Sequence, residues 1–140
     1  MPADYTLQRL SARLMFIQWH RTPTSESGNS FVQALQSLLN EAEEVQYFIS
    51  DLRRGRIIDM AVINRLGNLT RHPRWGGSTA FSANPISQIF AQSFLKLASH
   101  PKDLNAIFDK PEDAIQFLES LCPGLTSEPS LDWNAIIRQL

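Results

Sequence analysis

The chain has a single cysteine, Cys122, in 140 residues, so it cannot form an internal disulfide. It has no Cys-x-x-Cys pair, and its histidines, His20, His72 and His100, lie too far apart in sequence to match the short ligand spacings of zinc sites. No apolar run approaches the roughly 18 residues that a membrane-spanning helix needs. The first residues carry Asp4 and no apolar stretch of the kind found in signal peptides. These absences predict a cytoplasmic protein without a membrane span, a metal site or a cofactor.

Motifs for catalysis are also missing. Gly76-Gly77-Ser78 follows a predicted helix and precedes a predicted strand, whereas phosphate-binding glycine loops follow a strand and open a helix. Ser78 lacks the Gly-x-Ser-x-Gly setting of a hydrolase nucleophile. Asp51 and Asp59 suit a strand end and a helix N-cap better than an acid and base pair. We therefore expect no enzymatic activity.

What the chain does contain is enough apolar sequence for one domain, with 43% hydrophobic and 19% charged residues. Apolar periodicity predicts the order β-β-α-β-α-β-α-β-α plus a C-terminal helix, which indicates an α/β sandwich with helices packed on a mixed sheet. Residues 1–124 are expected to form this domain. Residues 125–140 are expected to form a connector and an amphipathic helix, packed either on the domain or on the partner in a homodimer.

Two loops are predicted from composition. The run His20–Asn29 contains Pro, Gly and several hydroxyl residues, so it predicts a loop, with Asn29 or Ser30 as the N-cap of the next helix. Gly76-Gly77 predicts a turn that leads into a short strand over residues 78–83.

Two further helices begin at recognisable caps. Asn84-Pro85 predicts an N-cap followed by proline at the first helical position. The inward stripe of that helix is predicted to consist of Ile86, Ile89, Phe90, Phe94 and Leu97. Ser130 is predicted to cap the last helix. The apolar residues of that helix are Leu131, Trp133, Ile136, Ile137 and Leu140.

Positive charge is concentrated in residues 53–74, where six arginines face one acid, Asp59, for a local net charge of +5. Because the whole chain has a net charge of −1, the remainder carries −6. Duplex-binding domains are usually basic overall, so nucleic acid is not an expected partner. The expected partner- or anion-binding surface consists of Asp59, Arg53, Arg54, Arg56, Arg71, Arg74 and Trp75. Ligands of open α/β sheets collect at the carboxyl edge of the strands, so we expect Arg53–Arg56 and Arg71–Trp75 to meet there.

Residues 47–59 read YFISDLRRGRIID and resemble the STAS domain, the fold of SpoIIAA-like anti-sigma-factor antagonists. In that family a central strand ends in Asp-Leu, and a second Asp eight positions later opens a helix. Asp51-Leu52 and Asp59 keep this spacing. The likeness runs from Tyr5 to Cys122, and its later part resembles a divergent bacterial subgroup with His-Pro near the end of the second helix. It implies a non-catalytic signalling module that binds a regulatory protein partner.

The chain departs from this family at the phosphorylation switch. The family carries a phosphorylatable Ser or Thr two residues after the helix-opening Asp, and the phosphate disrupts docking through charge and bulk. Here that position is Ala61, flanked by Met60 and Val62. Any partner contact is then expected to be constitutive or controlled elsewhere. The alternative function is binding of a small anionic or lipid-like molecule between sheet and helices, given the rich supply of Phe and Leu.

Overall fold

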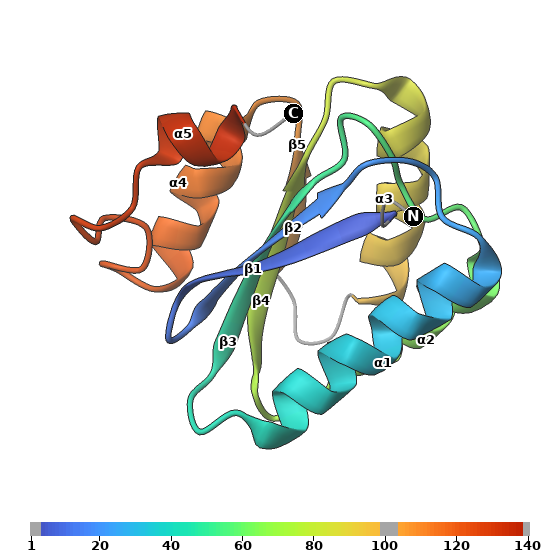
Figure 1. The fold of residues 1–140 in the computed structure, drawn as a ribbon, viewed down its shortest axis with the longest axis horizontal. Coiled ribbons are helices and arrows are strands. Elements are labelled where there is room, and N and C mark those ends of the chain that lie inside the picture. Colours follow the sequence, from blue (N-terminus) through green and yellow to red (C-terminus); the bar gives the residue numbers. More distant parts are fainter. Residues whose placement is uncertain (1–3, 99–103, 139–140) are drawn as a thin grey trace.

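The computed structural model describes residues 4–98 and 104–138, so His100 and Leu140 lie outside the described residues. The strands and helices follow the predicted order, which is confirmed (Figure 1). In chain order they are β1 (Tyr5–Ser11), β2 (Leu14–Trp19), α1 (Ser25–Glu41), β3 (Gln46–Asp51), α2 (Met60–Leu69), β4 (Trp75–Phe81), α3 (Pro85–Leu97), β5 (Asn105–Phe108), α4 (Pro111–Leu121) and α5 (Trp133–Ile137).

The strands form one mixed sheet in the order β1-β2-β3-β4-β5. The β1–β2 hairpin is antiparallel, and the other three pairings are parallel. Figure 1 shows α1, α2 and α3 on one face of the sheet and α4 and α5 on the other. The nearly continuous apolar run of β3 is explained by this arrangement, because the central strand is covered on both faces.

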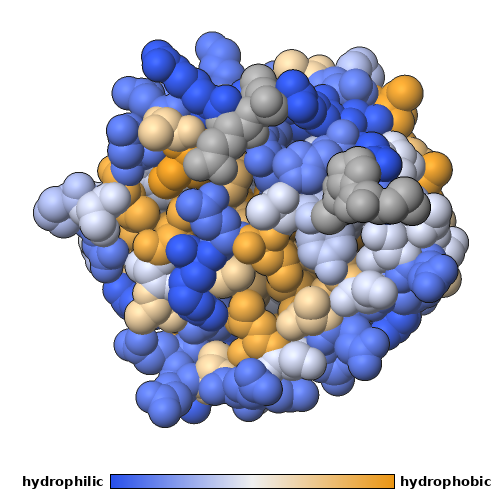
Figure 2. Space-filling model, in the orientation of Figure 1, coloured by the Kyte–Doolittle hydropathy of each residue, from blue (hydrophilic) through white to orange (hydrophobic). Residues whose placement is uncertain are grey.

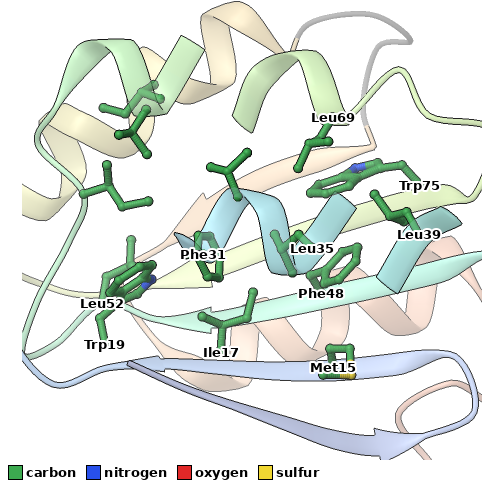
Figure 3. Close-up of a cluster of buried hydrophobic side chains, with 14 residues drawn as sticks. Met15, Ile17, Trp19, Phe31, Leu35, Leu39, Phe48, Leu52, Leu69 and Trp75 are labelled. Atoms are coloured by element: carbon green, nitrogen blue, oxygen red, sulfur yellow. The ribbon is translucent and has the colours of Figure 1, made fainter. Parts of the chain in front are cut away.

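Each face of the sheet has its own hydrophobic core. The core under α1, α2 and α3 is rich in aromatic rings, and Figure 3 shows Phe48 and Trp75 side by side on neighbouring strands. Their ring centroids lie 4.6 Å apart in a stacked arrangement, and those of Trp19 and Phe31 lie 4.8 Å apart, edge to face. The second core consists of Leu14, Phe16, Ile49, Phe81, Ala114, Leu118, Leu125 and Ile136.

Helix α1 begins earlier than predicted, at Ser25, because Thr24 is its N-cap. The Thr24 hydroxyl accepts a hydrogen bond from the backbone N–H of Ser27 at 3.1 Å. Gly28, which favoured a loop in the sequence, lies inside the helix and is buried. A Cβ atom there would lie 3.2 Å from the methyl groups of Val62, so this glycine permits close packing of α1 against α2.

The predicted Gly76-Gly77 turn is also wrong, because both glycines belong to strand β4. Gly76 lies at the register shift where β4 begins to pair with β3. A Cβ atom on Gly76 would lie 2.4 Å from Val45 and 2.7 Å from the Tyr47 ring. The glycine therefore marks a close approach between strands rather than a change of direction.

Helix α3 has the predicted N-cap, since the Asn84 side chain accepts from the N–H groups of Ile86 at 2.8 Å and Ser87 at 3.4 Å. Its predicted inward stripe is only partly right. The helix packs through Ser87, Phe90, Ala91 and Phe94, so Ile86 and Ile89 point to solvent. Leu97 lies beside Gly67 of α2 and is 37% exposed. The 3.6-residue period allows either face of this helix to turn inward. In the structure the inward face has Ser87 and Ala91 in place of the larger Ile86 and Ile89.

Helix α5 begins at Trp133 with Asp132 as its N-cap, two residues later than the predicted Ser130 cap. The Asp132 carboxylate accepts from the N–H of Ala135 at 3.2 Å. Ile136 is buried in the second core, and the Trp133 indole N–H donates to the carbonyl oxygen of Thr126 at 2.8 Å. The C-terminal helix thus lies against the sheet of its own chain.

Candidate functional site

The segment between β3 and α2 lies at the carboxyl end of the sheet. It follows Asp51, the last residue of β3, whose buried carboxylate accepts several hydrogen bonds. Asp51, which is 1% exposed, accepts from the Arg53 backbone N–H at 3.0 Å and from its side-chain Nε and Nη2 at 2.9 and 2.8 Å. Gln18 Nε2 adds a bond at 3.2 Å. Because four donors surround this buried carboxylate, Asp51 anchors Arg53 and is not arranged as a catalytic base.

Arg53 uses its charge inside the molecule. In addition to its ion pair with Asp51, its Nη2 donates to the backbone carbonyl oxygen of Ile137 at 2.5 Å. The guanidinium carbon lies 5.2 Å from the centroid of the Phe81 ring, within the range of a cation–π contact. Arg53 therefore joins β3, β4 and α5.

The next two arginines of this segment have different surroundings. Arg54 is exposed. Arg56 is half-buried, and its Nε donates to the Ser87 hydroxyl at 2.9 Å. That hydroxyl in turn donates to the Leu52 carbonyl oxygen at 2.9 Å, so the segment is fastened to the first turn of α3.

Asp59 is the N-cap of α2, as the sequence predicts. Its Oδ1 accepts from the N–H groups of Ala61 at 2.9 Å and Val62 at 3.4 Å, and its Oδ2 accepts from the Ser25 hydroxyl. The Ser25 bond, followed by the Ala61 bond, holds the pKa of the Asp59 carboxyl below its ordinary value. The carboxylate therefore stays ionised at neutral pH and joins the starts of α1 and α2. Ala61 is exposed in the first turn.

The expected meeting of Arg53–Arg56 with Arg71–Trp75 does not occur. Strands β3 and β4 run parallel, with Gln46 beside Trp75 and Asp51 beside Phe81. Arg71 and Arg74 precede β4 and so lie at the amino end of the sheet, about 17 Å of strand away from Arg53. The prediction placed residues 71–75 at the carboxyl edge of the sheet, whereas this segment leads into β4 and therefore lies at the amino edge.

Trp75 itself belongs to the core. It is buried, stacks on Phe48, and donates from its indole N–H to the Asn105 side-chain oxygen at 3.0 Å. Arg71 and Arg74 are exposed. Of the seven predicted residues, Trp75 is thus in the core and Arg53 is an inner anchor. Asp59, Arg54 and Arg56 lie at the carboxyl end of the sheet, and Arg71 and Arg74 lie at its amino end.

An exposed group of apolar side chains at the carboxyl end was missed by sequence reasoning. Ile58, Met60, Ile86 and Ile89 lie at the starts of α2 and α3, with exposures of 45, 52, 53 and 63%. The Arg56–Ser87 hydrogen bond joins the segment that leads into α2 to the first turn of α3. We call these four residues the apolar patch. Ile58 and Met60 flank the cap Asp59, and the buried residues of α2 begin only at Val62.

The described part of the chain has neither a cluster of metal ligands nor a membrane-spanning helix. Across residues 4–98 and 104–138, no three His, Cys, Asp or Glu side chains come together as metal ligands would. The helices in the same two ranges include none with the length and apolar character to span a bilayer.

Comparison with known proteins bears on the fold. No family model and no curated protein sequence matches the chain. Among solved structures it is similar to the anti-sigma factor antagonist SpoIIAA in its unphosphorylated form, with 12% identity and a TM-score of 0.56. The match covers 83% of this chain and 96% of SpoIIAA. The chain therefore has a SpoIIAA-like α/β fold, which confirms the STAS-like fold expected from its sequence.

Proposed function

We propose that this chain is a non-catalytic, cytoplasmic interaction module that binds a regulatory protein partner. The observation that carries the proposal is the apolar patch. Its four large side chains are each 45% or more exposed, at the starts of two helices that pack against each other. Soluble proteins seldom expose such groups together unless they meet a partner.

The surroundings of the patch suit a docking surface. Both helix starts are held rigid by side-chain caps, Asp59 for α2 and Asn84 for α3, so little order must be gained on binding. Exposed Arg54 lies on the segment that leads into α2 and offers a positive rim to an acidic partner surface. Arg53 contributes by holding this segment in place rather than by contacting the partner.

The similarity to SpoIIAA supports the class of function. SpoIIAA is named an anti-sigma factor antagonist, and its described state is the unphosphorylated one. By the Asp51-to-Asp59 spacing that resembles the family, we take Ala61 as the switch position, and alanine has no hydroxyl to phosphorylate. We therefore propose a partner contact that is constitutive at this position.

Site-specific photocrosslinking tests the proposal. A benzophenone amino acid is placed at Met60 or Ile89 in the patch, and at Leu97, which is exposed at the opposite end of α3, as the matched control. The tagged protein is irradiated in cells of the source organism, and adducts are identified by mass spectrometry. One protein that crosslinks from both patch positions and not from Leu97 supports the proposal.

Three outcomes contradict it. Equal yields from Leu97 and from the patch indicate non-specific collision. Adducts only with a second copy of the chain identify the patch as a homodimer contact. No adduct from either patch position removes the observation on which the function depends.

A further inference from the structure

A cavity of about 90 Å³ lies between the sheet and the layer formed by α1, α2 and α3. Large apolar side chains such as Phe48, Leu66 and Phe94 surround it. Short side chains leave the space open, because Ser50 and Ala80 on the sheet face Ala91 on α3 across it. Protein interiors are usually close-packed, so a cavity of this size is a candidate ligand site.

The cavity is in contact with solvent. Ser50 and Ala80 lie on β3 and β4, inside the sheet, and pair with each other in register. Both keep partial solvent exposure although helices cover this face. On the face that Figure 2 shows, apolar side chains also come to the surface near the middle of the molecule, among hydrophilic ones. A small molecule can therefore reach apolar walls without unfolding the domain.

A positive charge lines this apolar space. The half-buried Arg56 side chain borders the cavity, and its Nε is fixed by the Ser87 hydroxyl. Between Asp4 and Arg138, leaving aside 99–103, the ion pairs are Arg21 with Asp4 and Arg53 with Asp51. Arg56 Nη1 and Nη2 thus have no carboxylate partner in the described chain. A guanidinium presents these two nitrogens in the geometry that matches a carboxylate.

We infer that the cavity binds a small amphiphilic monocarboxylate, with its carboxylate on Arg56 and its aliphatic tail between the sheet and α3. An engineered protein cavity of about 150 Å³ accepts benzene, so this smaller space fits a tail of about four carbon atoms. The apolar walls reject a second charge on the tail. The four side chains of the apolar patch do not line this cavity, although the Arg56–Ser87 bond lies beside both.

Titration with sodium pentanoate, followed by two-dimensional NMR of the labelled protein, tests the inference. Binding is expected to shift the amide signals of Ser50, Ala80 and Ala91 in a saturable way. Acetate supplies the charge without the tail, and 1-butanol supplies the tail without the charge. Both are expected to bind at least about tenfold more weakly, since each lacks one half of the recognition.

Paired variants separate the site from a surface effect. Arg56→Gln is expected to weaken pentanoate binding at least about tenfold through loss of a charge-assisted pair, whereas Arg54→Gln on the same segment leaves it unchanged. Ala91→Leu fills the cavity and is expected to abolish binding in a folded protein, and it decides the matter if Arg56→Gln does not fold. The inference is overturned by unsaturable shifts, by acetate binding as tightly as pentanoate, or by undiminished binding to Ala91→Leu.

Discussion

Replacing Thr79 with valine is expected to stabilise the protein. Thr79 is 3% exposed in β4, and within the two described ranges its hydroxyl is the buried side-chain polar atom without a hydrogen-bond partner. Strand alternation places it on the same face as Phe81, in the core beneath α4. Its register neighbours, Ile49 on β3 and Ala106 on β5, have no polar side-chain atom to offer.

The size of the effect follows from this burial. A hydroxyl that is removed from water without a replacement bond costs about 1 to 3 kcal/mol. Valine has nearly the same shape and no hydroxyl, so it removes that cost without opening a cavity. We expect the free energy of unfolding to rise by about 1 to 2 kcal/mol, which corresponds to a Tm increase of about 3 to 6 °C in a domain of this size.

Urea denaturation followed by circular dichroism measures this difference, with Thr70→Val as the matched control. Thr70 is also 3% exposed, but its hydroxyl donates to the Gly67 carbonyl oxygen at 2.6 Å. The same substitution there is expected to lower the free energy of unfolding by about 1 kcal/mol. If Thr79→Val is neutral or destabilising with an unchanged m-value, the hydroxyl is satisfied in solution and the reasoning is refuted.

Three other predictions concern the loss or gain of a charge. Arg53→Met leaves the buried Asp51 carboxylate unpaired, so the free energy of unfolding is expected to fall by about 3 kcal/mol, with faster amide exchange in α5 measured by mass spectrometry. The N–H of Gly124, followed by bonds from Thr126, lowers the pKa of Glu119 to about 2. The stability from these bonds is thus complete above pH 4.5 and is lost as the pH falls through about 2, which carboxyl NMR should show and Glu119→Gln should remove. Ala61→Glu is expected to abolish the partner crosslink while leaving Tm unchanged or higher, because a negative charge is favourable in the first turn of a helix; a lower Tm contradicts this.

Elements with strong local signals were predictable from the sequence. The apolar run that became β3 is buried on both faces, and its Asp-Leu ending identified the central strand. Asp59 and Asn84 cap α2 and α3 as expected, because an N-cap depends on bonds within the next three residues. Such bonds are local, so the sequence alone contains the information.

Features that depend on a distant neighbour were not predictable. Gly28 and Gly76 resemble loop signals in sequence, but each lies against side chains that are distant in sequence. These are the Val62 side chain for Gly28, and the Val45 and Tyr47 side chains for Gly76. The phase of α3 depends on what the sheet presents beneath it, so the exposure of Ile89 could not be read from the helical period. The half of the apolar patch that lies on α3, Ile86 and Ile89, was missed for this reason.

The carboxyl-end surface shows the same limit. The sequence correctly shows a stretch that is rich in arginine. In the fold, however, the arginines that precede a strand and those that follow one lie at opposite ends of the sheet. Arg54 follows β3 and Arg74 precedes β4, so they lie at opposite ends of a parallel pair. Topology, which arises from the whole chain, decides which charges act together.

The bond between Arg53 and Ile137 has a consequence for the order of folding. It joins residues 84 positions apart, so a long loop must close before it can form. Arg53 is itself oriented by Asp51 on the central strand, which requires the sheet to be assembled first. We therefore expect α5 to dock last during folding, after the sheet has assembled. We also expect it to detach first on heating or during limited proteolysis.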